Sequence, residues 1–343
     1  MSGTSLDGLD IAYCEFEKID EKWSYQIHYA ETINYPDEWK DRLTNIENGS
    51  ALDLAAADTE YGHFLGLQTR SFIEKNKIHP DFVASHGHTI FHQPGKKMTW
   101  QIGKGSSITA ETGLPVVCDF RSLDVALGGQ GAPLVPIGDR LLFSEFDYCL
   151  NLGGFANISY EEKGERIAFD ICPVNIVLNH LTKRIGKPFD PSGQMARTGT
   201  LSPSLLSSLN NLPYYDQPPP KSLGKEWVLS HILPLLDPSS ILLNDQLNTF
   251  CEHVAIQLAR STSGHKPGKI LVTGGGAFNE YLVGRIKKHS IHEIILPDEN
   301  TINFKEALIF AFLGVLRWLE ETNCLRSVTG AAKDTSGGSV YFY

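Results

Sequence analysis

The segment Tyr148-Cys-Leu-Asn-Leu-Gly-Gly-Phe-Ala-Asn157 indicates the kind of fold that this chain adopts. Its first five residues are mostly apolar, which is typical of a short buried strand, and the strand runs directly into Gly153-Gly154. Further strands are predicted at residues 158–160 and 166–170, on either side of a Glu/Lys/Gly turn that favours a hairpin. We therefore expect a sheet with glycine turns at its strand ends.

Strands and helices alternate on both sides of this segment. Short apolar runs predict more strands, at residues 11–16, 81–84, 115–119 and 269–273. Longer amphipathic patterns predict helices, at residues 51–75, 175–185, 241–261, from Asn279 onward, and at 305–321. The proline-rich stretch 212–225 is predicted to be a surface loop. This alternation is typical of an α/β protein.

Two more glycine-rich turns accompany apolar strands. They are Ser2-Gly-Thr-Ser-Leu-Asp-Gly-Leu-Asp10 and Leu271-Val-Thr-Gly-Gly-Gly-Ala277. Glycines let backbone N–H groups approach a phosphate closely, although none of the three turns matches the P-loop or the dinucleotide fingerprint. Each turn alone is more often an ordinary tight turn. Together they favour a nucleotide held between two lobes, with the third turn supporting the adenosine.

Asp170 follows an apolar strand, in Ile167-Ala-Phe-Asp-Ile-Cys-Pro173. One interpretation is a cap for the helix that begins near Asn175. The other is a general base, because open α/β sheets bind ligands at their strand ends. The local sequence leaves both interpretations open.

Several polar residues are candidates for binding a second ligand. His86, His88 and His92 are close together, and a substrate hydrogen bond or a structural role is favoured over metal ligation. Arg121 can bind a carboxylate through two parallel hydrogen bonds, or it can form a surface salt bridge. Glu306 at the start of the last predicted helix can complement the helix dipole or accept a hydrogen bond from a sugar hydroxyl.

The loop Gly128-Gly-Gln-Gly-Ala-Pro-Leu134 is unusual in composition. Its glycines indicate a close approach of the backbone to a ligand or to the other lobe.

Composition narrows the class of protein. The chain has 343 residues, which suggests two domains at about 150 residues each. Its net charge of −10, without a basic block, argues against nucleic-acid or anionic-membrane partners. The start of the chain is small and polar, so we expect no signal peptide, and no apolar run is long enough to span a membrane. Six scattered cysteines without a Cys-x-x-Cys pair favour reduced thiols in a cytoplasm.

Taken in order along the chain, the motifs resemble those of the anhydro-N-acetylmuramic acid kinase family. The resemblance is carried by Met1-Ser-Gly-Thr-Ser-Leu-Asp-Gly8, Ser85-His-Gly-His-Thr89, Val117-Cys-Asp-Phe-Arg121, Gly128-Gly-Gln-Gly-Ala-Pro-Leu-Val-Pro136, Leu150-Asn-Leu-Gly-Gly-Phe-Ala-Asn-Ile158, Phe169-Asp170, Gly274-Gly-Gly-Ala277, Lys305-Glu-Ala307 and Ser327-Val-Thr-Gly-Ala331. It covers essentially the whole chain.

The resemblance implies an α/β, two-lobed, actin-like (ribonuclease H-like) ATPase fold with the nucleotide in the interlobe cleft. The expected N-terminal lobe comprises residues 1–128 plus about 305–343, and the C-terminal lobe comprises residues 129–304. It also implies a cytoplasmic homodimer that recycles cell-wall sugar. The implied reaction uses ATP, with Mg²⁺ held mainly through phosphates and water. It opens the 1,6-anhydro ring of anhydro-N-acetylmuramic acid by hydrolysis and phosphorylates the oxygen on carbon six.

By resemblance, each candidate residue also receives a role. Asp170 is the expected general base. The expected nucleotide-binding residues are Gly3, Thr4, Ser5, Leu6, Asp7, Gly8, Leu9, Asp10, Asn151, Gly153, Gly154, Gly274, Gly275 and Gly276. The expected sugar-binding residues are His86, Arg121, Asp124, Gln130 and Glu306. No residue is expected to bind a metal directly.

The sequence departs from the family pattern at three places. Family members have a short strand before Met-Ser-Gly-Thr, which is expected to pair beside residues 11–16. Cys172 and Val174 replace two glycines after the base, so a narrower or differently shaped phosphate pocket is expected. Residues 101–107 lack the usual Gly-Asp-Pro, and Phe278 replaces a usual histidine. The alternative functions are a kinase for another 1,6-anhydro sugar, or a nucleotide-binding regulator or chaperone-like ATPase without sugar chemistry.

Overall fold

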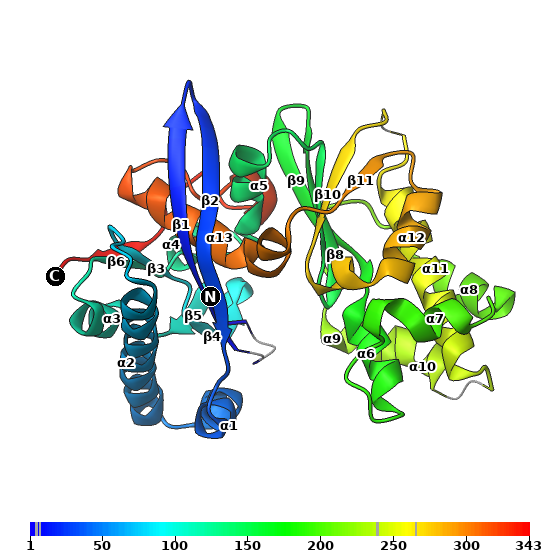
Figure 1. Cartoon of the computed structure of the whole chain (residues 1–343), viewed down its shortest axis with the longest axis horizontal. Coiled ribbons are helices and arrows are strands. Elements are labelled where there is room, and N and C mark those ends of the chain that lie inside the picture. The colour runs from blue at the N-terminus through cyan, green and yellow to red at the C-terminus, as the bar shows by residue number, and fades with distance from the viewer. Residues whose placement is uncertain (4–5, 7, 238–239, 265) are drawn as a thin grey trace. The chain divides into compact units, whose positions relative to one another are not determined.

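The computed structural model describes residues 1–3, 6, 8–237, 240–264 and 266–343 (Figure 1). The chain divides into two compact units: unit 1 comprises Met1–Leu142 and Phe304–Tyr343, and unit 2 comprises Phe143–Asn303. We expected the first lobe to end at residue 128, whereas α5 (Val135–Leu142) still belongs to unit 1. The physical reason is its packing against α13 (Glu299–Trp318). Asp139 pairs with Lys305 at 2.7 Å, and Gly138 leaves room for Ile309.

Unit 1 contains three small sheets. A hairpin pairs β1 (Leu9–Ile19) with β2 (Lys22–Ile33), and a second hairpin pairs β4 (His88–Gln93) with β5 (Met98–Ile102). In the third sheet, β6 (Val116–Cys118) lies between β3 (Val83–Ser85), which is parallel to it, and β12 (Ser339–Tyr341), which is antiparallel. The strands predicted near residues 11–16, 81–84 and 115–119 are therefore present.

The helices of unit 1 pack on these sheets. They are α1 (Asp37–Asn45), α2 (Ala51–Asn76), α3 (Gly105–Thr112), α4 (Ser122–Ala126), α5, the part of α13 from Phe304 onward, and α14 (Arg326–Thr329). Ser50 begins α2 with a capping box, because its hydroxyl accepts from the N–H of Asp53 while the Asp53 carboxylate accepts from the N–H of Ser50. The last helix was predicted at residues 305–321. It begins earlier, at Glu299, and has a non-helical residue at Phe304.

One edge of β1 and one edge of β3 face a cavity of about 580 Å³ inside unit 1. Residues 9–16 of β1 and residues 82–85 line it from the strands, and α2 and α13 supply apolar side chains. Among the described strands, β1 is hydrogen-bonded to β2 alone. Leu9 and Asp10 also pair with Ser2 and Met1, so the side of β1 on which the resemblance places an additional family strand is open only beyond Asp10.

Unit 2 is built on a five-stranded sheet in the order β11-β10-β7-β8-β9. An antiparallel meander joins β7 (Tyr148–Leu152), β8 (Phe155–Glu162) and β9 (Glu165–Pro173). β10 (Lys269–Thr273) pairs with β7, and β11 (Glu293–Ile295) pairs with β10. Both pairings are parallel. A meander followed by two parallel strands beside its first strand is the ribonuclease H-like order. The expected α/β architecture in two units is confirmed.

Helices cover the sheet of unit 2. They are α6 (Asn175–Lys183), α7 (Gln194–Thr198), α8 (Pro203–Asn210), α9 (Lys225–Trp227), α10 (Leu233–Leu236), α11 (Leu243–Ser261) and α12 (Glu280–His289). The central helix, α11, is buried along most of its length, and it contacts β9, α8 and α12. The stretch 212–225 is mostly exposed and residues 217–224 form no helix or strand, so the predicted surface loop is confirmed there. Its first part contains a short 3₁₀ helix at Pro213–Asp216 and the buried side chain of Tyr214.

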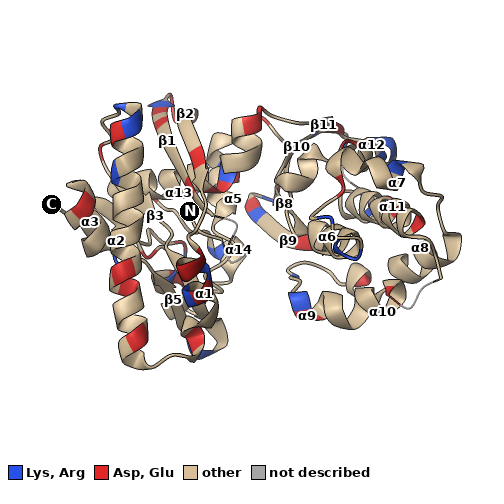
Figure 2. Cartoon of the chain, turned by 60° about the horizontal axis from the view of Figure 1, so that its bottom comes forward, with Lys and Arg blue, Asp and Glu red and all other residues tan. Residues whose placement is uncertain are grey.

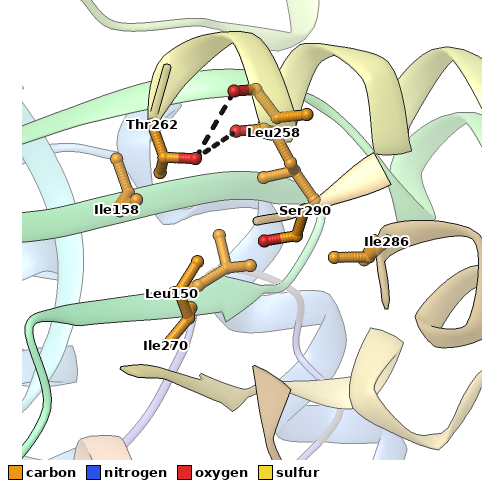
Figure 3. Close-up of a pocket in the computed structure, with 8 residues that line it drawn as sticks. Leu150, Ile158, Leu258, Thr262, Ile270, Ile286 and Ser290 are labelled. Atoms are coloured by element: carbon orange, nitrogen blue, oxygen red, sulfur yellow. Dashed lines mark hydrogen bonds between the residues drawn. The ribbon is translucent and has the colours of Figure 1, made fainter. Parts of the chain in front are cut away.

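Between the sheet of unit 2 and its helices lies a small apolar cavity of about 10 Å³ (Figure 3). Leu150 and Ile158 face it from the sheet, and Leu258 and Ile286 face it from the helices. The Thr262 hydroxyl turns back to donate to the Leu258 carbonyl at 3.3 Å. The volume is enough for a single water molecule at most, so this cavity is a packing gap in the core.

Acidic residues are spread over elements of both units, for example along α2 (Figure 2). The net charge of −10 is therefore distributed among many elements. All six cysteines are free thiols. In the described part of the chain, no helix combines the length and the apolar character needed to cross a membrane.

Candidate active site

In unit 2, polar residues form a row across four strands of the sheet. Thr273 pairs with Asn151, Asn151 pairs with Asn157, and Asn157 pairs with Asp170. Directly paired residues on neighbouring strands have their side chains on the same face. Two strand spacings of about 4.8 Å place Asp170 roughly 10 Å from Asn151 across the sheet. A bulge in the β8–β9 pairing lies next to Asp170 and redirects the strand there.

Two of the predicted glycine turns, residues 153–154 and 274–276, meet at the end of this sheet. Gly274 has φ +80°, and a Cβ there would lie 2.5 Å from Asn151 Oδ1. A Cβ on Gly276 would lie 2.7 Å from Leu152 Cβ. These two glycines are therefore required by the close approach of the turns to each other.

Gly154 and Gly275 face open space, whereas a Cβ on Gly153 would lie 3.2 Å from Asn151 Nδ2. A Cβ on Gly154 would meet nothing closer than Ile176 at 4.0 Å, and a Cβ on Gly275 nothing closer than Asn175 Nδ2 at 3.8 Å. Asn175 connects the turns to α6, because its side-chain amide donates to the Leu152 carbonyl at 3.1 Å. The converging turns thus leave room for a ligand beside Gly154 and Gly275.

Asp170 is half-buried and does not cap α6. Its carboxylate Oδ2 accepts from the Leu223 N–H at 2.9 Å. The N-cap of α6 is Val174, which makes no side-chain cap hydrogen bond. Burial raises the pKa of Asp170, and the hydrogen bond from Leu223 opposes this shift. The cap interpretation of Asp170 is therefore wrong, and its role as a general base stays a prediction. The strand was predicted to end at residue 170, but β9 continues to Pro173, so Asp170 lies three residues before its end.

Cys172 and Val174, which replace two family glycines, do not project their side chains onto the surface of the protein. Both side chains are completely buried and belong to the apolar core of unit 2. Burial also raises the pKa of the Cys172 thiol, which keeps it neutral. The two replacements therefore add to the core and not to the ligand-facing surface.

The first glycine turn lies in unit 1, and Thr4, Ser5 and Asp7 fall outside the described residues. On either side of these positions the chain forms a hairpin, in which Ser2 pairs with Leu9. The Asp10 N–H donates to the Met1 carbonyl at 2.9 Å.

The flanks of this turn are tightly packed. A Cβ on Gly8 would lie 2.6 Å from Thr32 Cγ2, so glycine is required there by β2. Leu9 is buried, and Asp10 accepts a hydrogen bond from the Thr32 hydroxyl at 2.6 Å. Gly3 and Leu6 lie within the turn, where the Leu6 N–H donates to the Gly3 carbonyl at 3.2 Å.

A buried polar chain supports this turn. Ser2 Oγ lies 2.7 Å from His88 Nδ1, and the Tyr35 hydroxyl donates to Ser2 Oγ at 2.7 Å. The Tyr61 hydroxyl lies 2.7 Å from that of Tyr35. His88 therefore has the structural role that was one of its two favoured interpretations.

His86 and Arg121 form a close pair in unit 1. Both Nε and Nη2 of Arg121 lie 3.0 Å from His86 Nε2, and Arg121 Nη1 donates to the Gly131 carbonyl at 2.6 Å. His86 Nδ1 lies 3.0 Å from the Gly87 carbonyl, which fits a neutral ring that donates through Nδ1 and accepts through Nε2. Burial and the Arg121 charge both lower the pKa of His86, in agreement with the neutral form.

Phe310 supports this pair from α13. Its ring centroid lies 4.6 Å from that of His86 and 5.7 Å from the Arg121 guanidinium. Glu306, one turn earlier on α13, is exposed. Desolvation by the surrounding protein raises the pKa of the Glu306 carboxyl, and the nearby positive charge of Arg121 opposes this shift. α13 begins at Glu299 but is kinked at Phe304, so Glu306 lies in the first turn of the helical part after the kink. Both interpretations of Glu306, helix-dipole partner and sugar-hydroxyl acceptor, stay predictions.

Asp124 is buried and makes its contacts to protein groups. It accepts hydrogen bonds from the Gly131 N–H at 2.7 Å, the Thr329 hydroxyl at 2.7 Å and the Cys324 thiol at 3.1 Å. These contacts hold the 128–134 loop in place. Gln130 in that loop is exposed, and its backbone N–H donates to the Thr329 carbonyl at 2.8 Å.

Each of the three neighbouring histidines has a different partner, since His92 Nδ1 lies 3.1 Å from the Thr99 hydroxyl. Within the residues that the structure describes, no group of three or more His, Cys, Asp or Glu side chains is arranged to hold a metal ion.

Several residues at these two sites were missed by sequence reasoning. Asn157 lies between Asn151 and Asp170 in the polar row, and alternation along its strand could have identified it. Tyr214, Leu223 and Phe310 approach the candidate residues from distant parts of the chain. No local sequence signal marks them.

Glycine turns at the end of the sheet of unit 2, with a half-buried carboxylate on a nearby strand, suit a phosphotransferase, because phosphoryl transfer depends mainly on positioning and on neutralising charge. The family model "Anhydro-N-acetylmuramic acid kinase" matches residues 1–343. The chain belongs to the anhydro-N-acetylmuramic acid kinase family, as the motifs predicted, and it is a sugar kinase that uses ATP.

Individual relatives agree with the family match. An anhydro-N-acetylmuramic acid kinase of Sulfurovum sp. (strain NBC37-1) is 32% identical over 99% of this chain and 97% of its own length. One of Vibrio cholerae serotype O1 is 34% identical over 100% of this chain and 97% of its own length. A ROK family glucokinase from Streptomyces griseus, solved with glucose and AMPPNP, has 12% identity and a TM-score of 0.35, covering 83% of this chain and 94% of its own. That structural likeness is too weak to carry an argument.

Proposed function

We propose that the chain uses ATP to convert 1,6-anhydro-N-acetylmuramic acid into N-acetylmuramic acid 6-phosphate during peptidoglycan recycling. Water adds to the anomeric carbon, the bond from that carbon to oxygen six breaks, and oxygen six accepts the γ-phosphoryl group as ADP leaves. The observation that carries this proposal is the row that aligns Asp170 with the glycine turns on one face of the sheet, in a chain of this family.

Asp170 would act as the general base. It would accept the proton of the attacking water, which requires the ionised carboxylate within hydrogen-bond reach of that water. Burial raises its pKa and so makes the ionised form a stronger base than an exposed aspartate. The hydrogen bond from Leu223 occupies Oδ2 and orients the group.

The glycine turns of unit 2 would bind the nucleotide. The open space beside Gly154 and Gly275 fits a bound phosphate, because backbone N–H groups can approach it without a side chain in between. When bound, ATP supplies the phosphoryl group. Asn151 and the 274–276 turn would then hold it at the end of the sheet, and the first glycine turn of unit 1 would bind phosphates as well.

The His86–Arg121–Glu306 group would bind the sugar. Arg121 has its Nε and Nη2 directed at His86, so it would offer its remaining N–H groups and its charge to the lactyl carboxylate. Glu306 is exposed and would accept a hydrogen bond from a sugar hydroxyl. Gln130 would contact the sugar from the 128–134 loop, and Asp124 would contribute by holding that loop.

Three further features of the proposal follow from the family resemblance. Mg²⁺ would be held through the phosphates and water, the protein would form a homodimer, and it would function in the cytoplasm.

The test is an assay of ADP release with a panel of sugars. We expect ADP release with MgATP and 1,6-anhydro-N-acetylmuramic acid. In Asp170→Asn we expect the turnover rate to fall by about 10²–10⁴-fold, which is the usual contribution of a general base. Stronger release with levoglucosan would favour the kinase for another anhydro sugar. ADP release that no sugar stimulates would overturn the proposal in favour of an ATPase without sugar chemistry.

A further inference from the structure

The segment 212–224 forms hydrogen bonds with the backbone of Asp170 and also with its carboxylate. The Asp170 N–H donates to the Lys221 carbonyl at 3.1 Å, and the Tyr214 hydroxyl donates to the Asp170 carbonyl at 2.6 Å. The Leu223 N–H donates to the Asp170 carboxylate at 2.9 Å. β9 is an edge strand, so the segment takes the backbone groups of Asp170 that face away from β8.

The segment is itself firmly anchored at Tyr214. The Tyr214 side chain is buried, and its ring centroid lies 5.4 Å from that of Trp227. Lys221 Nζ lies 4.7 Å from the centre of the Tyr214 ring and donates to the Tyr214 carbonyl at 3.2 Å. The hydroxyl of Tyr214 is therefore held at a fixed place relative to the Asp170 backbone.

The two carboxylate oxygens of Asp170 differ in their hydrogen bonding. Oδ2 accepts from Leu223, whereas no hydrogen bond to Oδ1 is formed by any residue in the described part of the chain. A base needs one free lone pair aimed at the water, with the rest of the group fixed. We propose that the 212–224 segment positions Asp170 for catalysis and that Tyr214 is its positioning residue; this inference rests on the proposed function of Asp170 as the base.

The test compares two neighbouring tyrosines. Tyr214→Phe removes the hydroxyl that binds Asp170 and keeps the buried ring. Tyr215→Phe is the matched control, because the Tyr215 hydroxyl lies 2.9 Å from His253 Nε2 instead. For both variants, kcat and KM for 1,6-anhydro-N-acetylmuramic acid are measured by ADP release from pH 4 to 9, after thermal unfolding has shown that they fold.

For Tyr214→Phe we expect kcat to fall about tenfold, as for the loss of one well-made hydrogen bond, with KM changed less than twofold. Burial is the larger of the two effects on the pKa of Asp170. A loosened segment admits water, so the acid limb of the kcat profile should move to lower pH. Tyr215→Phe should keep the wild-type kcat within twofold and the wild-type acid limb.

Wild-type kcat and pH profile in Tyr214→Phe would overturn the inference, as would equal losses in both tyrosine variants. If Tyr214→Phe does not fold, Lys221→Met, which removes the ammonium group that ties the segment to Tyr214, takes its place with the same expected result. Asp170→Asn separates the two proposals. Full sugar-dependent turnover in Asp170→Asn would refute the base itself, whereas its loss together with an unaffected Tyr214→Phe would refute only the positioning role.

Discussion

At the scale of single residues, burial determines the charge state of several side chains that the sequence shows only as polar. His253 on α11 is completely buried, and its ring nitrogens contact Tyr215 and Asn210 at 2.9 and 2.7 Å. Burial, with a smaller effect of Arg260, lowers the pKa of His253 to about 3. The folded protein therefore keeps this histidine neutral across the physiological range.

The neutral His253 gives the stability of the protein a pH dependence. Its pKa is lower in the folded than in the unfolded chain, so its contribution is complete above pH 6.5 and is lost as the pH falls toward 3. Between pH 7 and 5 we expect this one group to reduce the free energy of unfolding by about 2 kcal/mol. Urea unfolding of His253→Gln should show a correspondingly smaller loss over that interval, although the variant is less stable at pH 7. The same substitution at exposed His79 serves as the control, and an unchanged pH dependence in His253→Gln would refute the explanation.

Arg121 provides a residue-scale prediction about substrate recognition. If it binds the lactyl carboxylate, Arg121→Met should raise KM for 1,6-anhydro-N-acetylmuramic acid about 10–100-fold, as for a charge-assisted hydrogen bond. KM for 1,6-anhydro-N-acetylglucosamine, which lacks that carboxylate, should change much less. Equal effects on both sugars would mean that Arg121 acts by holding His86 and the 128–134 loop.

How far single residues could be predicted depends on where their partners lie in the sequence. Asp170 and the glycines were selected because an apolar strand and glycine-rich turns are local signals, and their functional roles stay predictions. The roles of Asp124 and Tyr214 could not be found in this way. Their partners Thr329 and Asp170 lie far away along the chain, and only the folded protein brings them together.

At the scale of elements, the 274–276 turn packs so closely on the end of β7 that Gly276 has no space for a side chain. Gly276→Ala would place a Cβ 2.7 Å from Leu152, and overpacking of this kind costs about 1–3 kcal/mol. Gly284→Ala on α12 is the matched control, because nothing lies within 4 Å of its Cβ position and alanine favours a helix by about 0.5–1 kcal/mol. Urea unfolding should thus show a lower free energy of unfolding for Gly276→Ala and a higher one for Gly284→Ala. A neutral Gly276→Ala would contradict the tight contact between the turns.

The open edge of β1 provides a second prediction about elements. A short apolar segment fused ahead of Met1 could pair with β1 inside the cavity of about 580 Å³. A gain of about 2 kcal/mol would raise the Tm by roughly 4–8 °C. A Gly/Ser segment of the same length is the control. Equal Tm values for the two fusions would show that the cavity does not accept a strand.

Elements were predicted well where their signal is local and poorly where it is not. The short buried strands and the long helix α2 were recognised from their apolar patterns. The predicted helix from residue 305 corresponds to the part of α13 that follows the kink at Phe304. The part before the kink, residues 299–303, was missed because four of its five side chains are polar. The 212–225 stretch is mostly exposed, as its prolines predicted, but they gave no sign of the buried side chain of Tyr214.

At the scale of the whole molecule, the two units carry different parts of the proposed chemistry. Unit 2 contains the candidate base and two nucleotide turns, and unit 1 contains the candidate sugar residues and the first turn. The sequence predicted this α/β organisation in two units, as well as the family, since the family motifs run in order through the whole chain. The boundary between the units was set too early, because the contact of α5 with α13 is long-range.

The central claim is that one active site couples hydrolysis of the anhydro ring to phosphorylation of oxygen six. The most direct test is to run the reaction in ¹⁸O-labelled water with MgATP and 1,6-anhydro-N-acetylmuramic acid. The reaction is quenched promptly, and the ¹⁸O content of the products is measured by mass spectrometry. The account predicts a sugar 6-phosphate with one ¹⁸O on carbon one, no labelled inorganic phosphate, and no product from Asp170→Asn. Label in inorganic phosphate, or a phosphorylated sugar without ¹⁸O, would contradict it.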